Sequence, residues 1–171
     1  MKLPTIAIYK EYSKGIKDNH VFLTRAQIHA DAYSTCCKVK VGSLIISENY
    51  EMIFGCNHGI ERNCEEKGCR RVEVYGENSK LHRLPSDCVS VHSEVDAICK
   101  AAKTGVNLLG AVIFVTRYPC EACARAIALS GIRRVVYGRK EEVSEMTKSI
   151  LDSAGVQIIH ESDWIYEDNN S

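Results

Sequence analysis

The 171-residue sequence lacks an excess of charge of either sign, because Lys plus Arg and Asp plus Glu each number 22. A balanced chain has no overall electrostatic attraction to nucleic acid or to an anionic membrane, so its composition favours a small-molecule partner. The sequence also lacks any run of about 18 apolar residues, and its first residues contain no sustained apolar segment of the secretory kind. These absences lead us to expect a cytoplasmic protein without a membrane partner.

Internal repeats, low-complexity tracts and linkers rich in proline and glycine are missing as well. At 171 residues and 45% hydrophobic composition, the chain has the size and content of a single globular domain. We expect an N-terminal arm over residues 1–20, one domain over 21–165 and a polar tail over 166–171. Within the domain, residues 58–89 are charged and cysteine-rich without a clear period, and an ordered loop of that length needs something to tie it down.

Cysteine, in contrast, is abundant, with nine residues. Disulfides do not explain this number in the cytoplasm, because that compartment keeps thiols reduced. Metal ligation is then the main explanation, and burial as small apolar side chains is the alternative. We expect burial for Cys56, Cys88 and Cys99.

The hydrophobic pattern predicts a mixed sheet covered by helices. The segments KVKVGSLIIS and YEMIFGCN predict two strands joined by a turn at residues 47–49, which is an antiparallel hairpin. After residue 92, helices and strands alternate, and that order predicts parallel neighbours. The other expected elements are helices over about 21–35, 93–103, 120–130 and 143–154, and strands over 111–116, 134–138 and 156–160.

Two motifs, VHSEVDAI and YPCEACARAI, contain residues suited to chemistry. Taken alone, the Cys120-x-x-Cys123 pair fits a redox pair, half of a structural zinc site, or two buried cysteines at a helix start. Pro119 suits the first turn of a helix, where its missing N–H is not needed. The positive end of that helix dipole would lower the pKa of both thiols and favour metal binding.

The spacing of the two motifs allows them to meet. The 24 residues between Glu94 and Pro119 hold one helix and one strand, enough to bring two helix starts side by side at one edge of the sheet. His92, Cys120 and Cys123 then form a three-ligand zinc set whose fourth position is left for water, as in catalytic sites. Glu94 would lie beside that water as a proton carrier. H-x-E with P-C-x-x-C is a known signature of zinc nucleobase deaminases, so the pattern predicts hydrolytic deamination.

Beyond these residues, the chain resembles the cytidine and deoxycytidylate deaminase superfamily, and in particular its phage-type dCMP deaminases. HSEVDAICKAAKTG is similar to the family's H-A-E-x-N-A-I helix, and TRYPCEACARAIALSGIRRVVY to its T-x-x-P-C-x-x-C-A-x-x-I-x-x-x-G-I-x-x-V-x-Y stretch. KVKVGSLI and GCNHG resemble the V-G-A-x-I and G-Y-N-G segments of the deoxycytidylate branch. The resemblance covers residues 30–160. It implies a three-layer α/β/α cytidine deaminase-like fold, with helices on both faces of a mixed five-stranded sheet, in a homo-oligomer that hydrolyses dCMP to dUMP and ammonia.

The resemblance also implies which residues contact the substrate. Asn57, at the asparagine of G-Y-N-G, would hydrogen-bond the sugar. The main-chain groups at Tyr118 and Ser93 would orient the base. Tyr137 resembles a family tyrosine near the pocket.

Three residues depart from the family pattern. Ser93 stands in place of alanine, Asp96 in place of asparagine and Cys56 in place of the tyrosine before the G-Y-N-G asparagine. Ser93 is small and we expect it to be harmless. Two interpretations of Asp96 stay open: a first-turn acid that stabilises the helix dipole, or a change in how the neighbouring loop is held or in what the pocket accepts.

The cysteine-rich insertion resembles a segment that carries a second, structural zinc in phage members of the family. STCCKVKVG, NCEEKGC and KLHRLPSDC resemble its ligand-bearing parts. The resemblance implies Cys64, Cys69 and His82 as ligands, with either Cys36 or Cys37 as the fourth. Four such ligands would tether a loop too polar to fold by burial. The alternative is that these cysteines bind no metal.

Two other functions stay open at this point. One is a deaminase acting on tRNA or single-stranded DNA. The balanced charge and the dCMP-type hairpin count against it, because such enzymes contact flanking nucleotides. The other is a non-catalytic zinc-binding module. Glu94 counts against that, because a structural zinc has no use for a proton carrier and favours a fourth protein ligand.

Overall fold

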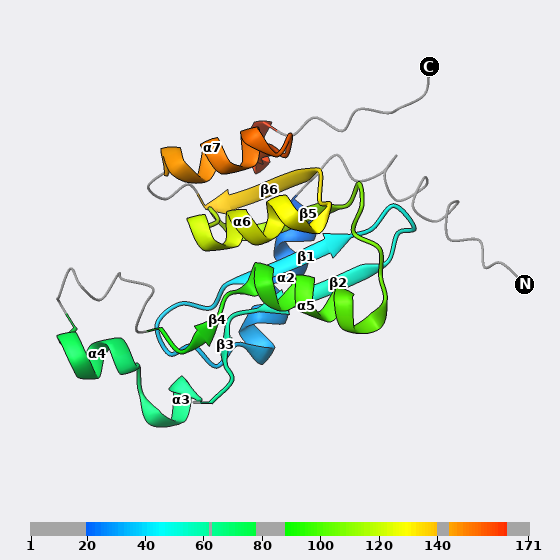
Figure 1. Ribbon diagram of the computed structural model, residues 1–171. Coiled ribbons are helices and arrows are strands. Elements are labelled where there is room, and N and C mark those ends of the chain that lie inside the picture. The colour runs from blue at the N-terminus through cyan, green and yellow to red at the C-terminus, as the bar shows by residue number, and fades with distance from the viewer. Residues whose placement is uncertain (1–19, 62, 78–87, 140–143, 164–171) are drawn as a thin grey trace, which may run out of the picture.

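The computed structural model describes residues 20–61, 63–77, 88–139 and 144–163. Its centre is a five-stranded sheet in the order β2-β1-β5-β6-β7 (Figure 1). β1 pairs antiparallel with both β2 and β5, whereas β5, β6 and β7 run parallel. This confirms the predicted mixed sheet. The strands are β1 (Gly42–Ile46), β2 (Met52–Cys56), β5 (Val112–Arg117), β6 (Arg134–Arg139) and β7 (Gln157–His160).

Helices cover both faces of this sheet, as predicted. Figure 1 shows α5 and α6 in front of the sheet and α2 behind it. Alternate residues of each strand face opposite layers: Leu44 and Ile46 pack with α2, while Ile45 packs with α5 and its neighbours. The helices are α2 (His20–Tyr33), α5 (Ser93–Thr104), α6 (Glu121–Ser130) and α7 (Glu145–Ser153).

Two glycines bring helix backbone directly against the sheet. A Cβ on Gly42 would lie 1.9 Å from the carbonyl oxygen of Ala26 in α2. A Cβ on Gly55 would lie 2.1 Å from the carbonyl oxygen of Ser93 and 2.8 Å from the amide nitrogen of Ala97, both in α5. Only glycine fits at these contacts. The first turn of α5 therefore lies at a fixed depth on β2.

The predicted ends of α5 and α6 are confirmed, because Gly105 and Gly131 follow these helices with φ of 75° and 89°. β1, in contrast, begins at Gly42 and not at residue 38. The reason is a side chain: the amide of Asn57 accepts a hydrogen bond from the N–H of Val41 and donates one to the carbonyl of Val39. These backbone groups bond to a side chain in place of a neighbouring strand.

The insertion over residues 58–89 contains regular structure that the sequence pattern did not predict. Two short helices, α3 (Cys64–Lys67) and α4 (Arg70–Tyr75), lie in it. The side chain of Asn63 caps α3 by accepting from the N–H of Glu65. At its base, β3 (His58–Gly59) pairs antiparallel with β4 (Ser90–Val91). Helices of four and six residues are too short to show a hydrophobic period.

The predicted N-terminal arm, apart from His20, and the predicted tail over 166–171 lie outside the described residues. The domain boundaries therefore stay predictions. Within the part of the chain that the structure describes, no helix is both long and apolar enough to span a bilayer. The cytoplasmic location also stays a prediction.

Candidate metal centre and active site

The two chemical motifs meet where α5 and α6 begin. These helices pack side by side on the same face of the sheet. His92 is the residue that caps the start of α5, and Cys120 caps the start of α6. Cys123 lies in the first turn of α6 and is buried. Both helices therefore direct the positive ends of their dipoles toward one point.

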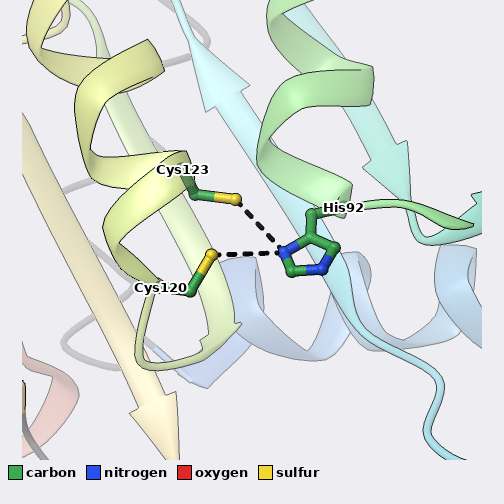
Figure 2. A group of neighbouring side chains, drawn as sticks. All are labelled: His92, Cys120 and Cys123. Carbon is green, nitrogen blue, oxygen red and sulfur yellow. Dashed lines mark hydrogen bonds between the residues drawn. The ribbon is translucent and has the colours of Figure 1, made fainter. Parts of the chain in front are cut away.

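The donor atoms of these three residues are placed for a metal ion. Nδ1 of His92 lies 3.4 Å from Sγ of Cys120 and 3.4 Å from Sγ of Cys123. Figure 2 shows both sulfur atoms directed at this nitrogen, and all three donors lie within 4.8 Å of one another. Tetrahedral zinc bonded to sulfur and imidazole nitrogen separates those two donors by about 3.6 Å. The donor set and its spacing therefore fit zinc.

The electrostatics of the two thiols also suit a cation. The pKa of Cys120 falls to about 3, because Cys123 hydrogen-bonds its sulfur, an effect to which His92 adds and which burial opposes. The pKa of Cys123 is raised, because its thiol is hydrogen-bonded to Cys120 and is buried. The two thiols are therefore coupled, with Cys120 the more acidic. Metal binding requires thiolates, so an ion here would displace the thiol protons.

Glu94 lies in the first turn of α5 and is only 4% exposed. Burial raises the pKa of its carboxyl group. The hydroxyl of Ser93 donates a hydrogen bond to Oε2 of Glu94 at 3.0 Å. The carboxyl also interacts with the Cys123 thiol. A buried carboxyl group whose pKa is raised holds a proton more readily than an exposed one, so Glu94 is suited to accept a proton and return it.

The sequence profile of the family described as "Cytidine and deoxycytidylate deaminase zinc-binding region" matches residues 16–139, which include both helix starts. The chain belongs to the cytidine and deoxycytidylate deaminase family. The resemblance stated from the motifs is therefore confirmed. Among members of this family, the deoxycytidylate deaminase of Mycobacterium phage D29 is 47% identical over 109 residues, which cover 63% of this chain and 84% of the phage protein.

Other phage proteins of the family extend the match. The deoxycytidylate deaminase of Enterobacteria phage T4 is 35% identical over 157 residues, covering 74% of this chain and 81% of that protein. The crystal structure of dCMP deaminase from cyanophage S-TIM5, in complex with dCMP and dUMP, matches with a TM-score of 0.61. It covers 94% of this chain and 99% of that one at 20% identity. At that identity the match confirms the cytidine deaminase-like fold.

Asn57, the predicted sugar contact of this family member, is buried directly after β2. Its Oδ1 accepts hydrogen bonds from the hydroxyl of Ser34 and the N–H of Val41, both at 2.8 Å. Its Nδ2 donates to the carbonyl of Val39 at 2.8 Å. The single hydrogen of the Ser34 hydroxyl is shared between Oδ1 and the main-chain carbonyl of Asn57, which lies 2.6 Å away, and the amide nitrogen uses one of its two hydrogens. A sugar contact through the side chain would therefore use the second amide hydrogen, and the role stays a prediction.

The two predicted tyrosines contact each other: Tyr118 directly follows β5, and Tyr137 lies in β6. The rings of Tyr118 and Tyr137 contact edge to face, with centroids 5.0 Å apart, and Tyr137 contacts the ring of His160 at 5.1 Å. The hydroxyl of Tyr118 is buried with no hydrogen-bond partner among the described residues. The two rings form one aromatic contact next to β5 and β6, and their contact with substrate stays a prediction.

Ser93 makes one side-chain and one main-chain contact that the sequence did not reveal. We expected this departure from alanine to be harmless, yet its hydroxyl donates to Glu94. Its carbonyl accepts a hydrogen bond from the hydroxyl of Ser43 at 2.7 Å, which ties the first turn of α5 to β1. The only signal in the sequence was the departure itself. The predicted main-chain contact of Ser93 with a base is not tested by these observations.

Four of the predicted ligands of the second zinc form one neighbourhood. The segment after α2, which holds Cys36 and Cys37, is joined to α3 by a hydrogen bond from the N–H of Glu65 to the carbonyl of Thr35 at 3.0 Å. The pKa of Cys37 is raised by burial and then by the neighbouring Cys69 and Cys36. The pKa of Cys64 is raised by burial and then by the nearby thiols of Cys36 and Cys37.

These sulfur atoms do not form a closed ligand set within the described part of the chain, where the groups of three donors within 4.8 Å lie elsewhere. The remaining candidate ligand, His82, lies outside the described residues. The second site therefore stays a prediction.

The predicted burial of three other cysteines is only partly correct. Cys56 is buried at 3% exposure, and Cys88 is half-buried. Cys99 is exposed, so that prediction was wrong. The reason is its place on α5, which turns this side chain to the outer surface, away from the buried Ala97 and Ala101.

Proposed function

We propose that this chain is a zinc-dependent deaminase of a free deoxycytidine nucleotide, and that it converts dCMP to dUMP with release of ammonia. The observation that carries the proposal is the meeting of His92, Cys120 and Cys123 with the buried carboxyl group of Glu94 at two helix starts. The names of the phage relatives, which match over most of their length, support dCMP as the substrate.

In the proposed reaction His92, Cys120 and Cys123 would hold zinc, and the ion would supply a water of lowered pKa as the nucleophile. Glu94 accepts a proton from the water that attacks C4 of the cytosine ring and delivers it to the ring nitrogen N3. The same carboxyl group then takes the remaining proton from the C4 hydroxyl and passes it to the amine, so that the C4–N bond breaks, ammonia leaves and the C4 carbonyl forms. The Ser93 hydroxyl holds Oε2 of Glu94 and orients the carboxyl group for these transfers.

The proposed substrate contacts follow from position. The second amide hydrogen of Asn57 bonds the sugar. The carbonyl of Tyr118 and the N–H of Ser93 orient the base, and Tyr137 lines the pocket beside Tyr118. The balanced charge of the chain favours a free nucleotide over tRNA or single-stranded DNA.

The test of this function is a substrate panel with purified protein of measured zinc content. Loss of ultraviolet absorbance and release of ammonia are followed with cytidine, dCMP, dCTP, 5-hydroxymethyl-dCMP, a cytosine-containing oligonucleotide and tRNA. We expect dCMP to react with the highest kcat/KM among the nucleotides. Reaction of tRNA or the oligonucleotide without reaction of dCMP would refute the proposal.

The role of Glu94 has its own test. Glu94→Gln should keep the metal at its three ligands and lose at least about 100-fold in kcat, because the proton carrier is gone. Glu121→Gln, which changes an exposed glutamate in the first turn of α6, is the matched control and should leave kcat unchanged. An unchanged kcat in Glu94→Gln would refute the role of Glu94 as proton carrier, and absence of deamination in the zinc-loaded wild type would favour the non-catalytic zinc module.

We also propose a second, structural zinc that is held by Cys64, Cys69 and His82 with Cys36 or Cys37. Its support is the scarcity of burial in the insertion: α4 buries no residue, and α3 buries only Cys64. Such a segment needs a tether other than a hydrophobic core. Wild type should contain two zinc ions per chain and Cys64→Ser one, by elemental analysis. One zinc in both would refute the second site. The predicted homo-oligomer is tested by light scattering of the same samples.

A further inference from the structure

A second cluster of side chains with metal-binding atoms lies beside the first turn of α5. Donor atoms of Cys56, His58 and Asp96 lie within 4.8 Å of one another. Cys56 and Asp96 are buried, and both are places where the chain departs from the family pattern. The proposed mechanism uses none of these side chains. We therefore ask what role this cluster has in the protein.

The carboxylate of this cluster is already paired with a cation, the ammonium group of Lys100. Nζ of Lys100 lies 2.7 Å from Oδ2 of Asp96, one helical turn further along α5. The same ammonium group donates to the carbonyl of Phe54 at 3.1 Å. A bound metal ion would have to displace this ammonium group, so we interpret the cluster as an internal ion pair. Pairing of this kind is what makes a buried carboxylate tolerable.

The ion pair joins α5 to the edge strand of the sheet. Oδ2 of Asp96 also accepts a hydrogen bond from the backbone N–H of Cys56 at 3.0 Å. β2 is at the edge of the five-stranded sheet, and its Phe54 carbonyl and Cys56 N–H bond to α5 side chains and not to another strand. Nδ1 of His58 lies 3.1 Å from the Cys56 carbonyl and 4.0 Å from Oδ2 of Asp96, which closes the cluster on its other side.

Both ends of this connection lead to the candidate active site. On the strand side, Cys56 is followed directly by Asn57, whose amide holds the loop before β1. On the helix side, the N–H of Asp96 donates to the carbonyl of His92 at 3.0 Å, within the turn that contains Glu94. The carboxylate of Asp96 therefore bonds to the residue before the proposed sugar contact, and its backbone belongs to the turn of the proposed metal ligand and proton carrier.

We propose that Asp96 and Lys100 are a positioning pair, whose ion pair across the end of β2 fixes Asn57 relative to the helix start that carries His92 and Glu94. This inference rests on the proposed function. Asn57 and α5 belong to separate segments of the chain, so their relative position depends on bonds between them. The asparagine that the family motif has in place of Asp96 is neutral and needs no cation. Aspartate and Lys100 should therefore depend on each other in this chain.

The experiment is a double-mutant cycle with Lys100→Met, Asp96→Asn and the combined variant. Lys103→Met, an exposed lysine in the last turn of the same helix, is the matched control. KM and kcat for dCMP, zinc content and Tm are measured at a temperature where circular dichroism shows every variant folded. Lys100→Met leaves an unpaired buried carboxylate, and we expect it to raise KM about tenfold, the middle of the range for coupled neighbours. Zinc content should stay unchanged and kcat should change less than KM.

The combined variant tests whether Asp96 and Lys100 depend on each other. With Asn at position 96 no charge is left unpaired and the amide oxygen can still accept from the Cys56 N–H, so Asp96→Asn/Lys100→Met should recover most of the KM and Tm lost in Lys100→Met. Lys103→Met should change neither. An unchanged KM in Lys100→Met, or a combined variant as impaired as the sum of the two single ones, would overturn the proposal. If wild type does not deaminate dCMP, the proposed function fails, and rescue of Tm in the combined variant still reports whether the two residues are coupled.

Discussion

Gly55→Ala should displace the first turn of α5, and its effect on kcat can be compared with its effect on the stability of the fold. The new Cβ would lie 2.1 Å from the carbonyl oxygen of Ser93 and 2.8 Å from the amide nitrogen of Ala97. Carbon and carbonyl oxygen normally approach no closer than about 3.3 Å, so the first turn of α5 must retreat by about 1 Å. Both clashing groups belong to the helix backbone, and no side-chain rotation can relieve them.

The displacement should affect both the stability of the fold and the rate of the reaction, because the first turn of α5 contains Glu94 and directly follows His92. Overpacking of this kind costs about 1–3 kcal/mol of the free energy of unfolding, which lowers Tm by about 2–4 °C per kcal/mol in a domain of this size. The larger effect concerns function, because His92 and Glu94 move with the turn. Misplacement of reacting groups by about 1 Å lowers kcat about 100-fold. Weaker zinc binding should accompany it, since His92 shifts away from the two cysteines.

Gly42→Ala provides the matched control on the other face of the sheet. Its Cβ would lie 1.9 Å from the carbonyl oxygen of Ala26, so it displaces α2 and not α5. Both variants are assayed for Tm, zinc affinity and kcat at a temperature where both are folded. We expect similar losses of Tm but a loss of kcat and zinc affinity only in Gly55→Ala. Equal kcat in the two variants, or a kcat within about twofold of wild type in Gly55→Ala, would refute the reasoning.

Three further outcomes can be checked with the same assays. Removal of zinc by a chelator should abolish deamination and lower Tm, and added zinc should restore both; activity that survives with no detectable zinc would contradict the assigned ligands. Ser93→Ala, which restores the family residue, should lower kcat severalfold with little change in Tm, because Glu94 loses the bond to Oε2; an unchanged kcat would show that this bond does not orient the carboxyl group. Asn57→Ala should lower the free energy of unfolding by about 1–3 kcal/mol, because buried backbone groups of residues 39 and 41 lose their partner, and should raise KM; a raised KM without a loss of Tm would show that the amide serves the substrate and not the loop.

The sequence by itself determined the local features of this protein. The ends of α5 and α6 follow from Gly105 and Gly131. The candidate zinc ligands could also be predicted, because each stands at a helix start and one helix and one strand separate the two motifs. Local spacing and chain direction suffice for such predictions, since a helix start orients its first residues without help from distant segments.

Only the tertiary structure decided how those features are held together. The bond between Asp96 and the N–H of Cys56 spans 40 positions of the sequence, and the bond between Ser34 and Asn57 spans 23. No periodicity encodes such pairs, because they form only when α5 and the loop before β1 pack against β2. The same packing shortened β1, and the outward turn of α5 exposed Cys99. Which polar groups meet depends on how closely the helices pack on the sheet. Gly55 allows the close approach of α5 to β2 because it has no Cβ.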